Sequence, residues 1–351
     1  MRIRFRFLSY TALCLIGALV FGSCESRSSD VGWVAGTFAG SNIPGFVDGP
    51  VSSARFSMPS GIAVDASGNV YVADWFNHRI RIISGGEVRS FAGSGGRGFS
   101  DGPASSARFN SPRGVAVDSS GNVYVADTGN HLIRIIRPGG EVETLAGSVQ
   151  GFSDGPAAQA MFDKPYGLAA DRSGNLYVAD MGNDRIRMIS GGEVSTFAGS
   201  GVQGFSDGPA SSARFKSPID LALDSSGNLY AADMGNHRIR MISGGEVSTF
   251  AGSGSRGFLN GQAAAARFND PYGLIADPSG NIYVVERDSH RIRVISSGLV
   301  NTFAGSGSSG LRNGPVARAR FNDPYSLAVG PSGNIYVADC NNHRIRILSL
   351  E

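Results

Sequence analysis

The chain has 351 residues, of which 41% are hydrophobic and 17% charged. This is enough apolar material for a large core and too little charge for a disordered chain. The formal net charge is only +2, and three of the 31 basic residues, Arg2, Arg4 and Arg6, lie at the start of the chain. A near-neutral remainder excludes an electrostatic basis for nucleic-acid binding.

The first 23 residues have the pattern of a secretory signal peptide. The three arginines precede an apolar run, residues 8–22, which is shorter than the roughly 20 residues of a membrane-spanning helix. The segment 21–24 (Phe-Gly-Ser-Cys) resembles the bacterial lipobox, although Phe21 stands where Leu is usual. In such proteins the cysteine becomes the first mature residue and carries lipid.

We therefore expect residues 1–23 to be a signal peptide and residues 24–31 a flexible tether. Cys24 is the expected lipidation site, which would anchor an exported protein to a membrane of the bacterial cell envelope. The alternative is ordinary signal cleavage, with Cys24 only flanking the cut.

A unit of 53 residues then repeats six times, and the asparagine of a Gly-Asn turn marks each copy. These asparagines are Asn69, Asn122, Asn175, Asn228, Asn281 and Asn334. Each copy holds four short β-type runs separated by turn residues, as in residues 114–118, 123–127, 133–136 and 142–147. Four strands joined by hairpins form one antiparallel blade, and six blades in a ring cover one another's faces.

The two ends of the repeat region predict how this ring closes. Residues 33–40 match only the fourth strand of a repeat, whereas the last copy stops at its third strand, residues 344–349. We therefore predict an all-β fold for residues 32–351, a six-bladed β-propeller of four-stranded antiparallel blades. Its N-terminal strand would complete the last blade and remove an open edge.

The phrase PSGIAVDASGNVYVADWFNHRIRII at residues 59–83 resembles the NHL repeat, which is named for an Asn-His-Leu triplet. That triplet is Asn77-His78-Arg79 here and Asn130-His131-Leu132 in the next copy. The resemblance covers residues 33–351 and implies a propeller. It implies no single function, because NHL proteins include peptide-amidating lyases, sensor domains of bacterial kinases, and RNA- or protein-binding modules. The DGPAxxARF loop is typical of exported bacterial members.

Polar residues that recur in every copy are interpreted as structural. The second strand ends on Asp74, Asp127, Asp180, Asp233, Glu286 or Asp339. We expect this acid to accept backbone and arginine hydrogen bonds in the following turn. The histidine column is His78, His131, His237, His290 and His343, with Asp184 in the third copy. We expect these histidines to join the second strand to the third. The alternative is a zinc site, but zinc ligands must lie about 2 Å from one ion, and residues one blade apart do not meet that demand.

Two columns differ between the copies, one just after the second strand and one just before the first. The sequence predicts that both lie on one face, around the mouth of the central channel. The candidate binding residues are Trp75, Arg113, Tyr166, Met181, Asp220, Met234, Tyr272, Arg287 and Tyr325. Aromatic, Met and Arg side chains are enriched at binding surfaces. The alternative is that these residues at exposed loop ends vary without any functional constraint.

These observations favour a non-catalytic binding or scaffold propeller that recognises a protein, peptide or glycan through its loop-rich face. We predict no catalytic residue, no metal and no cofactor, and we expect a monomer. The alternative is a metal-dependent lyase or lactonase with its active site in the channel. That enzyme would need His, Asp or Glu on the innermost strands, which are aliphatic here.

Overall fold

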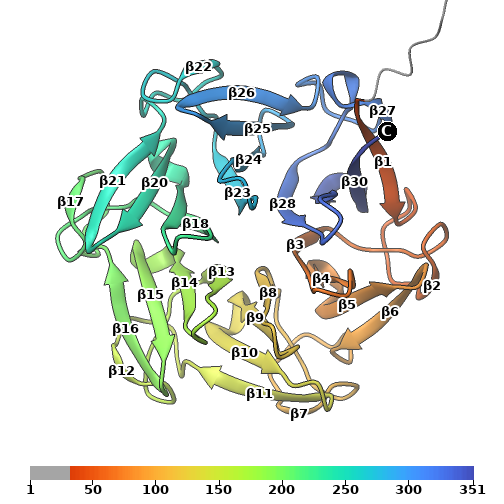
Figure 1. The fold of residues 1–351 in the computed structure, drawn as a ribbon. Helices are drawn as coiled ribbons and strands as arrows, with labels where there is room; N and C mark the ends of the chain where they lie inside the picture. Colours follow the sequence, from red (N-terminus) through yellow and green to blue (C-terminus); the bar gives the residue numbers. More distant parts are fainter. Residues whose placement is uncertain (1–31) are drawn as a thin grey trace, which may run out of the picture. The chain divides into compact units, whose positions relative to one another are not determined.

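The structure is a computed structural model that describes residues 32–351 (Figure 1). The predicted signal peptide, the tether and Cys24 lie outside the described residues. Within residues 32–351 no helix is long and apolar enough to cross a membrane.

The described residues form six antiparallel sheets arranged around a central axis, which confirms the six-bladed β-propeller (Figure 1). The innermost strands are β3 (Pro59–Val64), β8 (Val115–Val117), β13 (Pro165–Ala170), β18 (Pro218–Leu223), β23 (Pro271–Ala276) and β28 (Pro324–Val329). The second strands are β4 (Val70–Asp74), β9 (Val123–Asp127), β14 (Leu176–Asp180), β19 (Leu229–Asp233), β24 (Ile282–Glu286) and β29 (Ile335–Asp339). The third strands are β5 (Arg79–Ser84), β10 (Leu132–Ile136), β15 (Arg185–Ser190), β20 (Arg238–Ser243), β25 (Arg291–Ser296) and β30 (Arg344–Leu350).

The fourth strands are β6 (Glu87–Ala92), β11 (Glu141–Ala146), β16 (Glu193–Ala198), β21 (Glu246–Ala251), β26 (Leu299–Ala304) and β1 (Trp33–Ala39). Single 3-10 turns link the second and third strands: η1 (Trp75–Asn77), η2 (Thr128–Asn130), η3 (Met181–Asn183), η4 (Met234–Asn236) and η6 (Cys340–Asn342). A further 3-10 turn, η5 (Val316–Arg318), lies in the last long loop.

The ring closes as the sequence predicts, because the N-terminal strand β1 pairs with β30, the last strand of the chain (Figure 1). The ladder runs from Trp33 opposite Leu350 to Ala39 opposite Ile345. The side chains repeat the packing of an uninterrupted blade. Phe38 stacks on Tyr336 with ring centroids 4.8 Å apart, as Phe91 stacks on Tyr71 at 5.0 Å.

Each blade has five strands, and the prediction of four strands was wrong in this detail. The fifth, outermost strands are β2 (Gly49–Pro50), β7 (Gly102–Pro103), β12 (Gly155–Pro156), β17 (Gly208–Pro209), β22 (Gly261–Gln262) and β27 (Gly314–Pro315). They lie in the long loops, and each pairs by two residues with the fourth strand of its blade. Proline is tolerated at such an edge because its missing N–H faces away from the ladder.

A buried arginine in each third strand fixes the long loop to its blade. The Arg81 guanidinium donates to Asp74 Oδ2 at 2.8 Å and to the carbonyl oxygens of Arg55 and Val47, both at 2.9 Å. It also contacts Asp48 in the same loop. The equivalent arginines are Arg134, Arg187, Arg240, Arg293 and Arg346, all fully buried. These contacts confirm the expected structural role of the recurring acid.

The histidine column joins neighbouring blades, and the expectation that it joins two strands of one blade was wrong. His78 adopts a left-handed backbone (φ 52°) after η1, and its Nδ1 accepts the backbone N–H of Ser111 in the next blade at 3.1 Å. His343 accepts the N–H of Met58 at 3.2 Å, across the closure between the last blade and the first. In the third blade Asp184 takes the same role through the N–H of Ser217. An acceptor at this position therefore links successive blades at five of the six junctions. At the remaining one, His237 Nδ1 lies 3.3 Å from Asp270 Oδ1 of the next blade but has no hydrogen-bond partner within residues 32–351.

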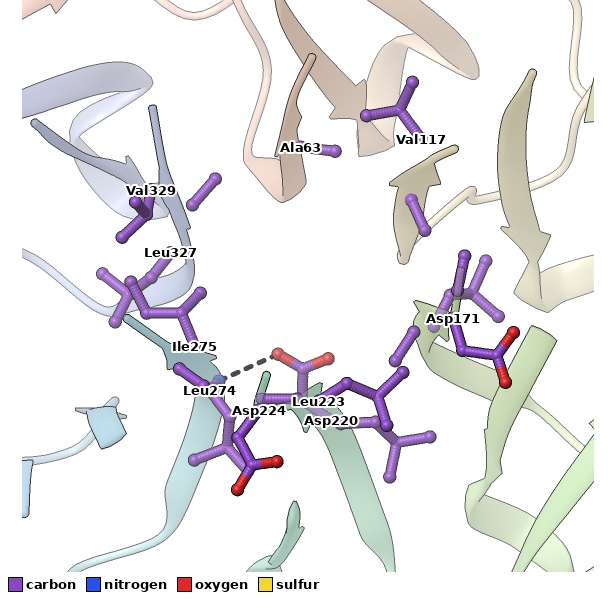
Figure 2. A pocket seen from close by; sticks show the side chains of 18 of the residues that line it. Ala63, Val117, Asp171, Asp220, Leu223, Asp224, Leu274, Ile275, Leu327 and Val329 are labelled. Atoms are coloured by element: carbon purple, nitrogen blue, oxygen red, sulfur yellow. Dashed lines mark hydrogen bonds between the residues drawn. The ribbon is translucent and has the colours of Figure 1, made fainter. Parts of the chain in front are cut away.

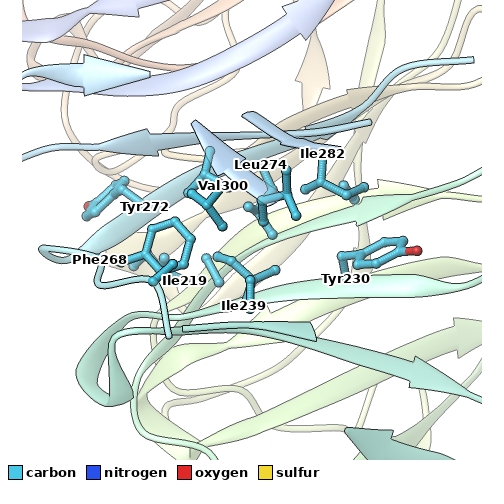
Figure 3. Close-up of a cluster of buried hydrophobic side chains, with 14 of the residues drawn as sticks. Ile219, Tyr230, Ile239, Phe268, Tyr272, Leu274, Ile282 and Val300 are labelled. Atoms are coloured by element: carbon cyan, nitrogen blue, oxygen red, sulfur yellow. The ribbon is translucent and has the colours of Figure 1, made fainter. Parts of the chain in front are cut away.

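Apolar side chains fill the space between adjacent blades. Figure 3 shows the cluster between the fourth and fifth blades, where Ile219 and Ile239 meet Phe268 and Val300. Phe268 belongs to the ARF segment of a long loop and is fully buried, as are its counterparts in the other blades. The long loops therefore contribute to the core as well as to one face of the ring.

Candidate functional site

The central channel contains a cavity of about 750 Å³ bounded by the innermost strands. Aliphatic side chains such as Leu223, Leu274 and Val329 line its walls, and polar atoms contribute as much of its surface as apolar atoms do (Figure 2). The turns that follow the innermost strands also line it, for example at residues 171–173 and 224–227. The cavity therefore opens at the mouth formed by these turns, which we call the turn mouth.

A constriction separates this cavity from the opposite mouth. Gly61, Gly114, Asp220 and Ser326 line both the large cavity and a second gap of about 20 Å³ beyond it. In four of the six blades this position is glycine, which lets neighbouring blades approach closely. A Cβ on Gly114 would collide with the carbonyl oxygen of Tyr166 in the next blade.

Beyond the constriction an aromatic plug fills the axis; it consists of Trp75, Arg113, Tyr166, Tyr272 and Tyr325. The Arg113 guanidinium lies over the Trp75 ring, with the centroids of Tyr166 and Tyr325 at 5.3 and 5.8 Å. The Tyr272 and Tyr325 rings are 4.6 Å apart, and the Tyr166 and Tyr272 hydroxyls are hydrogen-bonded to each other. The gap left beside these side chains holds about one water molecule.

The structure thus brings most of the candidate binding residues together at one mouth. Arg287 lies over the Tyr272 ring at 5.4 Å, and Met181 and Met234 pack against the cluster that contains Tyr166 and Tyr272. The two tyrosines themselves are buried, with 9% and 6% of their surface exposed. The partly exposed members of the face are Trp75, Arg113, Met181, Met234, Arg287 and Tyr325.

Asp220 is the exception, because it lies at the constriction with its carboxylate directed into the channel (Figure 2). Its Oδ2 accepts the backbone N–H of Leu274 in the next blade at 3.0 Å. Burial raises the pKa of Asp220 to about 7, although hydrogen bonds from the Leu274 and Leu221 backbone partly oppose that increase. No cation contributes to this balance.

Sequence reasoning did not select the rim of the turn mouth. Asp171, Asp224 and Asp277 end three innermost strands and line the cavity there. Each is held by its own turn: Asp224 Oδ1 accepts the N–H groups of Ser226 and Asn228, both at 2.9 Å. The available signal is an acid directly after the innermost strand in five of the six copies.

Within residues 32–351 no group of three or more His, Cys, Asp or Glu side chains is placed to hold a metal ion. The thiol of Cys340 is fully buried beside the plug, and burial raises its pKa. A buried neutral thiol acts as a small apolar side chain and is a poor nucleophile.

The NHL repeat family model matches residues 56–83, 109–136, 215–240 and 321–348. Each match begins at the buried phenylalanine of a long loop and extends into the third strand of one blade. The chain belongs to the NHL repeat family. Among its relatives, NHL repeat-containing protein 2 of Bos taurus is 32% identical over 340 residues, covering 84% of this chain and 47% of the relative. Protein SUPPRESSOR OF QUENCHING 1 of Arabidopsis thaliana is 27% identical, over 86% of this chain and 31% of the relative. The NHL chain therefore spans about half, or less, of these relatives.

Solved structures share the propeller fold of this NHL protein. A protein of unknown function from Bacteroides thetaiotaomicron superposes with a TM-score of 0.71 at 22% identity, over 92% of this chain and 77% of its own. An auxiliary nutrient binding protein from Bacteroides ovatus gives 0.70 at 18% identity, over 92% and 78%. A streptogramin B lyase gives 0.55 at 15% identity, over 91% and 98%. At these identities the similarity concerns the fold.

Proposed function

We propose that this NHL propeller is a non-catalytic binding module of the bacterial cell envelope. Its ligand would be a protein, peptide or glycan, held at the face that carries the aromatic plug. One observation carries the proposal: the two columns in which the six blades differ converge on the axis at a single mouth. Trp75, Arg113 and Tyr325 from three different blades contact one another there.

The chemistry of this face suits recognition of a ligand surface. Partly exposed Trp75 and Tyr325 offer flat apolar area, and Arg287 adds a charged group beside them. Such aromatic and arginine side chains contribute most of the affinity in many interfaces. The buried Tyr166 and Tyr272 support them from below. Solved propellers described as auxiliary nutrient binding proteins agree with a binding role.

The envelope location rests on the sequence of residues 1–24. We propose export by the signal peptide and anchoring through lipid on Cys24. Radiolabelled palmitate would be incorporated by the full chain but not by Cys24→Ser. Equal labelling of the two proteins would refute the anchor while leaving the binding proposal standing.

Tryptophan fluorescence tests the binding face directly, because the chain has only two tryptophans. In Trp33→Phe, Trp75 is the single reporter of the plug. Titration with peptidoglycan fragments, oligosaccharides or peptide pools should shift the Trp75 emission for the class that binds. Trp75→Ala/Arg287→Ala should lose that class in a quantitative pull-down from envelope extract. The matched control Arg172→Ala, at the opposite mouth, should retain it.

Equal recovery of all partners by the double variant would refute this choice of face. Metal analysis of the purified protein addresses the lyase or lactonase alternative. Zinc or calcium bound at one ion per chain would favour that enzyme over the binding module.

A further inference from the structure

The large cavity opens at the turn mouth, opposite the face proposed above, and has the properties of a separate small-molecule site. Its volume of about 750 Å³ lies within the range of ordinary ligand pockets, which is roughly 300–1,000 Å³. Its aliphatic walls would remove apolar surface of a ligand from water. The constriction and the plug close the far end, so that a ligand would enter and leave by one mouth.

A single carboxylate at the floor of this cavity breaks the symmetry of the repeat. Asp220 stands where the other blades have Gly61, Gly114, Gly167, Gly273 and Ser326. Its side chain projects into the channel from the starting end of β18 (Figure 2). No packing demand common to all blades explains it, since five blades form the same constriction without an acid.

Within residues 32–351 this carboxylate accepts hydrogen bonds but forms no salt bridge. Its partners are the backbone N–H groups of Leu274 and Leu221. The fully buried acids at the ends of the second strands differ: Asp74 pairs with Arg81 at 2.8 Å, and its equivalents pair in the same way. Removing part of a carboxylate from water without a cation is costly. Asp220, which is partly exposed to the channel, is therefore an acid that a positively charged ligand would complement.

The rim of the turn mouth also favours a positively charged ligand, because it carries more acidic than basic side chains. Asp171, Asp224 and Asp277 line the cavity there, against the one basic residue Arg172. The acidic side chains are engaged by their own turns, as Asp171 is by the N–H groups of Ser173 and Asn175. They would therefore attract a cation through their field without serving as its direct ligands.

We propose that the channel binds a small organic cation, an apolar molecule that carries an ammonium or amidinium group. The apolar body lies against the aliphatic side chains of the walls, and the cationic group reaches the floor and donates hydrogen bonds to the Asp220 carboxylate. This site goes beyond the binding face at the plug. Neither site depends on the other.

Two fluorescent probes that differ in one group test this assignment. Dansylcadaverine has an apolar ring system and a terminal ammonium, and its N-pentyl analogue lacks only the amine. Charge-assisted hydrogen bonds to the Asp220 carboxylate should make the wild-type protein prefer dansylcadaverine by about tenfold or more in Kd.

Asp220→Asn keeps the shape of the side chain, and Asp220→Gly restores the residue of four other blades, so that both variants should fold. Each should bind the two probes with equal affinity. Trp75→Ala/Arg287→Ala should keep the tenfold preference, which separates this site from the proposed binding face. Equal wild-type affinity for the two probes, no binding of either, or an unchanged preference in Asp220→Asn would overturn the assignment.

Discussion

Closure of the ring by β1 predicts that six residues at the start of the described chain stabilise the whole propeller. Deleting residues 33–38 removes the fourth strand of the last blade and exposes the edge of β30. The neighbouring blades lose part of their support, because Trp33 also stacks on Phe303 in the fifth blade at 5.1 Å. We expect this deletion to lower the unfolding midpoint of the entire ring rather than fray one end.

The magnitude follows from the contacts of β1. Six residue pairs join β1 to β30, and the deletion removes five of them; hydrogen bonds of such a ladder contribute about 0.5–1.5 kcal/mol each to net stability. The two aromatic pairs add about 0.5–1.5 kcal/mol each beyond their burial. The loss of roughly 3.5–10.5 kcal/mol is comparable with the entire stability of a typical domain, about 5–15 kcal/mol.

Denaturant unfolding followed by circular dichroism measures this effect. Because the deleted protein could fail to fold, two point variants test the same contact in a milder way. Phe38→Ala and Phe91→Ala remove the same aromatic contact, once across the closure and once inside an uninterrupted blade. Both should cost about 2 kcal/mol, less than the roughly 3–5 kcal/mol of a Phe→Ala change at a buried site, because both rings are partly exposed. A wild-type midpoint for Phe38→Ala, together with a lowered one for Phe91→Ala, would refute closure by β1.

Four further predictions concern the scaffold. Arg240→Leu leaves the buried Asp233 unpaired and should lower the free energy of unfolding by about 3–5 kcal/mol. The control Arg137→Leu breaks an exposed ion pair and should cost about 0.5 kcal/mol or less. Similar losses in the two variants would refute the role of the buried arginine. Burial lowers the pKa of His78 below 6.5, and its Nδ1 accepts a backbone N–H in the folded protein. As the pH falls, the unfolded chain therefore takes up the proton before the folded chain does. The folded state should lose stability as the pH drops below about 7. His78→Asp should weaken this pH dependence between about pH 7 and 5.5, and an unchanged slope would contradict the interblade role. Gly114→Ala should lower the melting temperature through the clash with Tyr166, but Gly139→Ala, with open space around it, should not. Cys340 should react with Ellman's reagent only as fast as the protein unfolds, and rapid labelling of the native protein would show that the thiol is accessible.

The repeat by itself determined the architecture of this protein. Identical turn chemistry at a constant spacing specified six hairpin-linked units, and the unmatched fourth strand at residues 33–40 specified which ends must pair. Recurrence also identified Asp74 and its equivalents as parts of the scaffold. These features could be predicted because each depends on residues close together in the chain, or on a pattern that every copy repeats.

The tertiary structure alone decided where the channel is open and which partners each side chain meets. His78 pairs with a backbone group 33 residues further along, in the next blade, and β2 contributes an edge strand of only two residues. The variable aromatic residues were predicted to lie at one mouth, but their packing into a plug, which leaves the large cavity at the other mouth, depends on side-chain geometry at the axis. Contacts between blades arise only when the ring is assembled, so no local pattern specifies them.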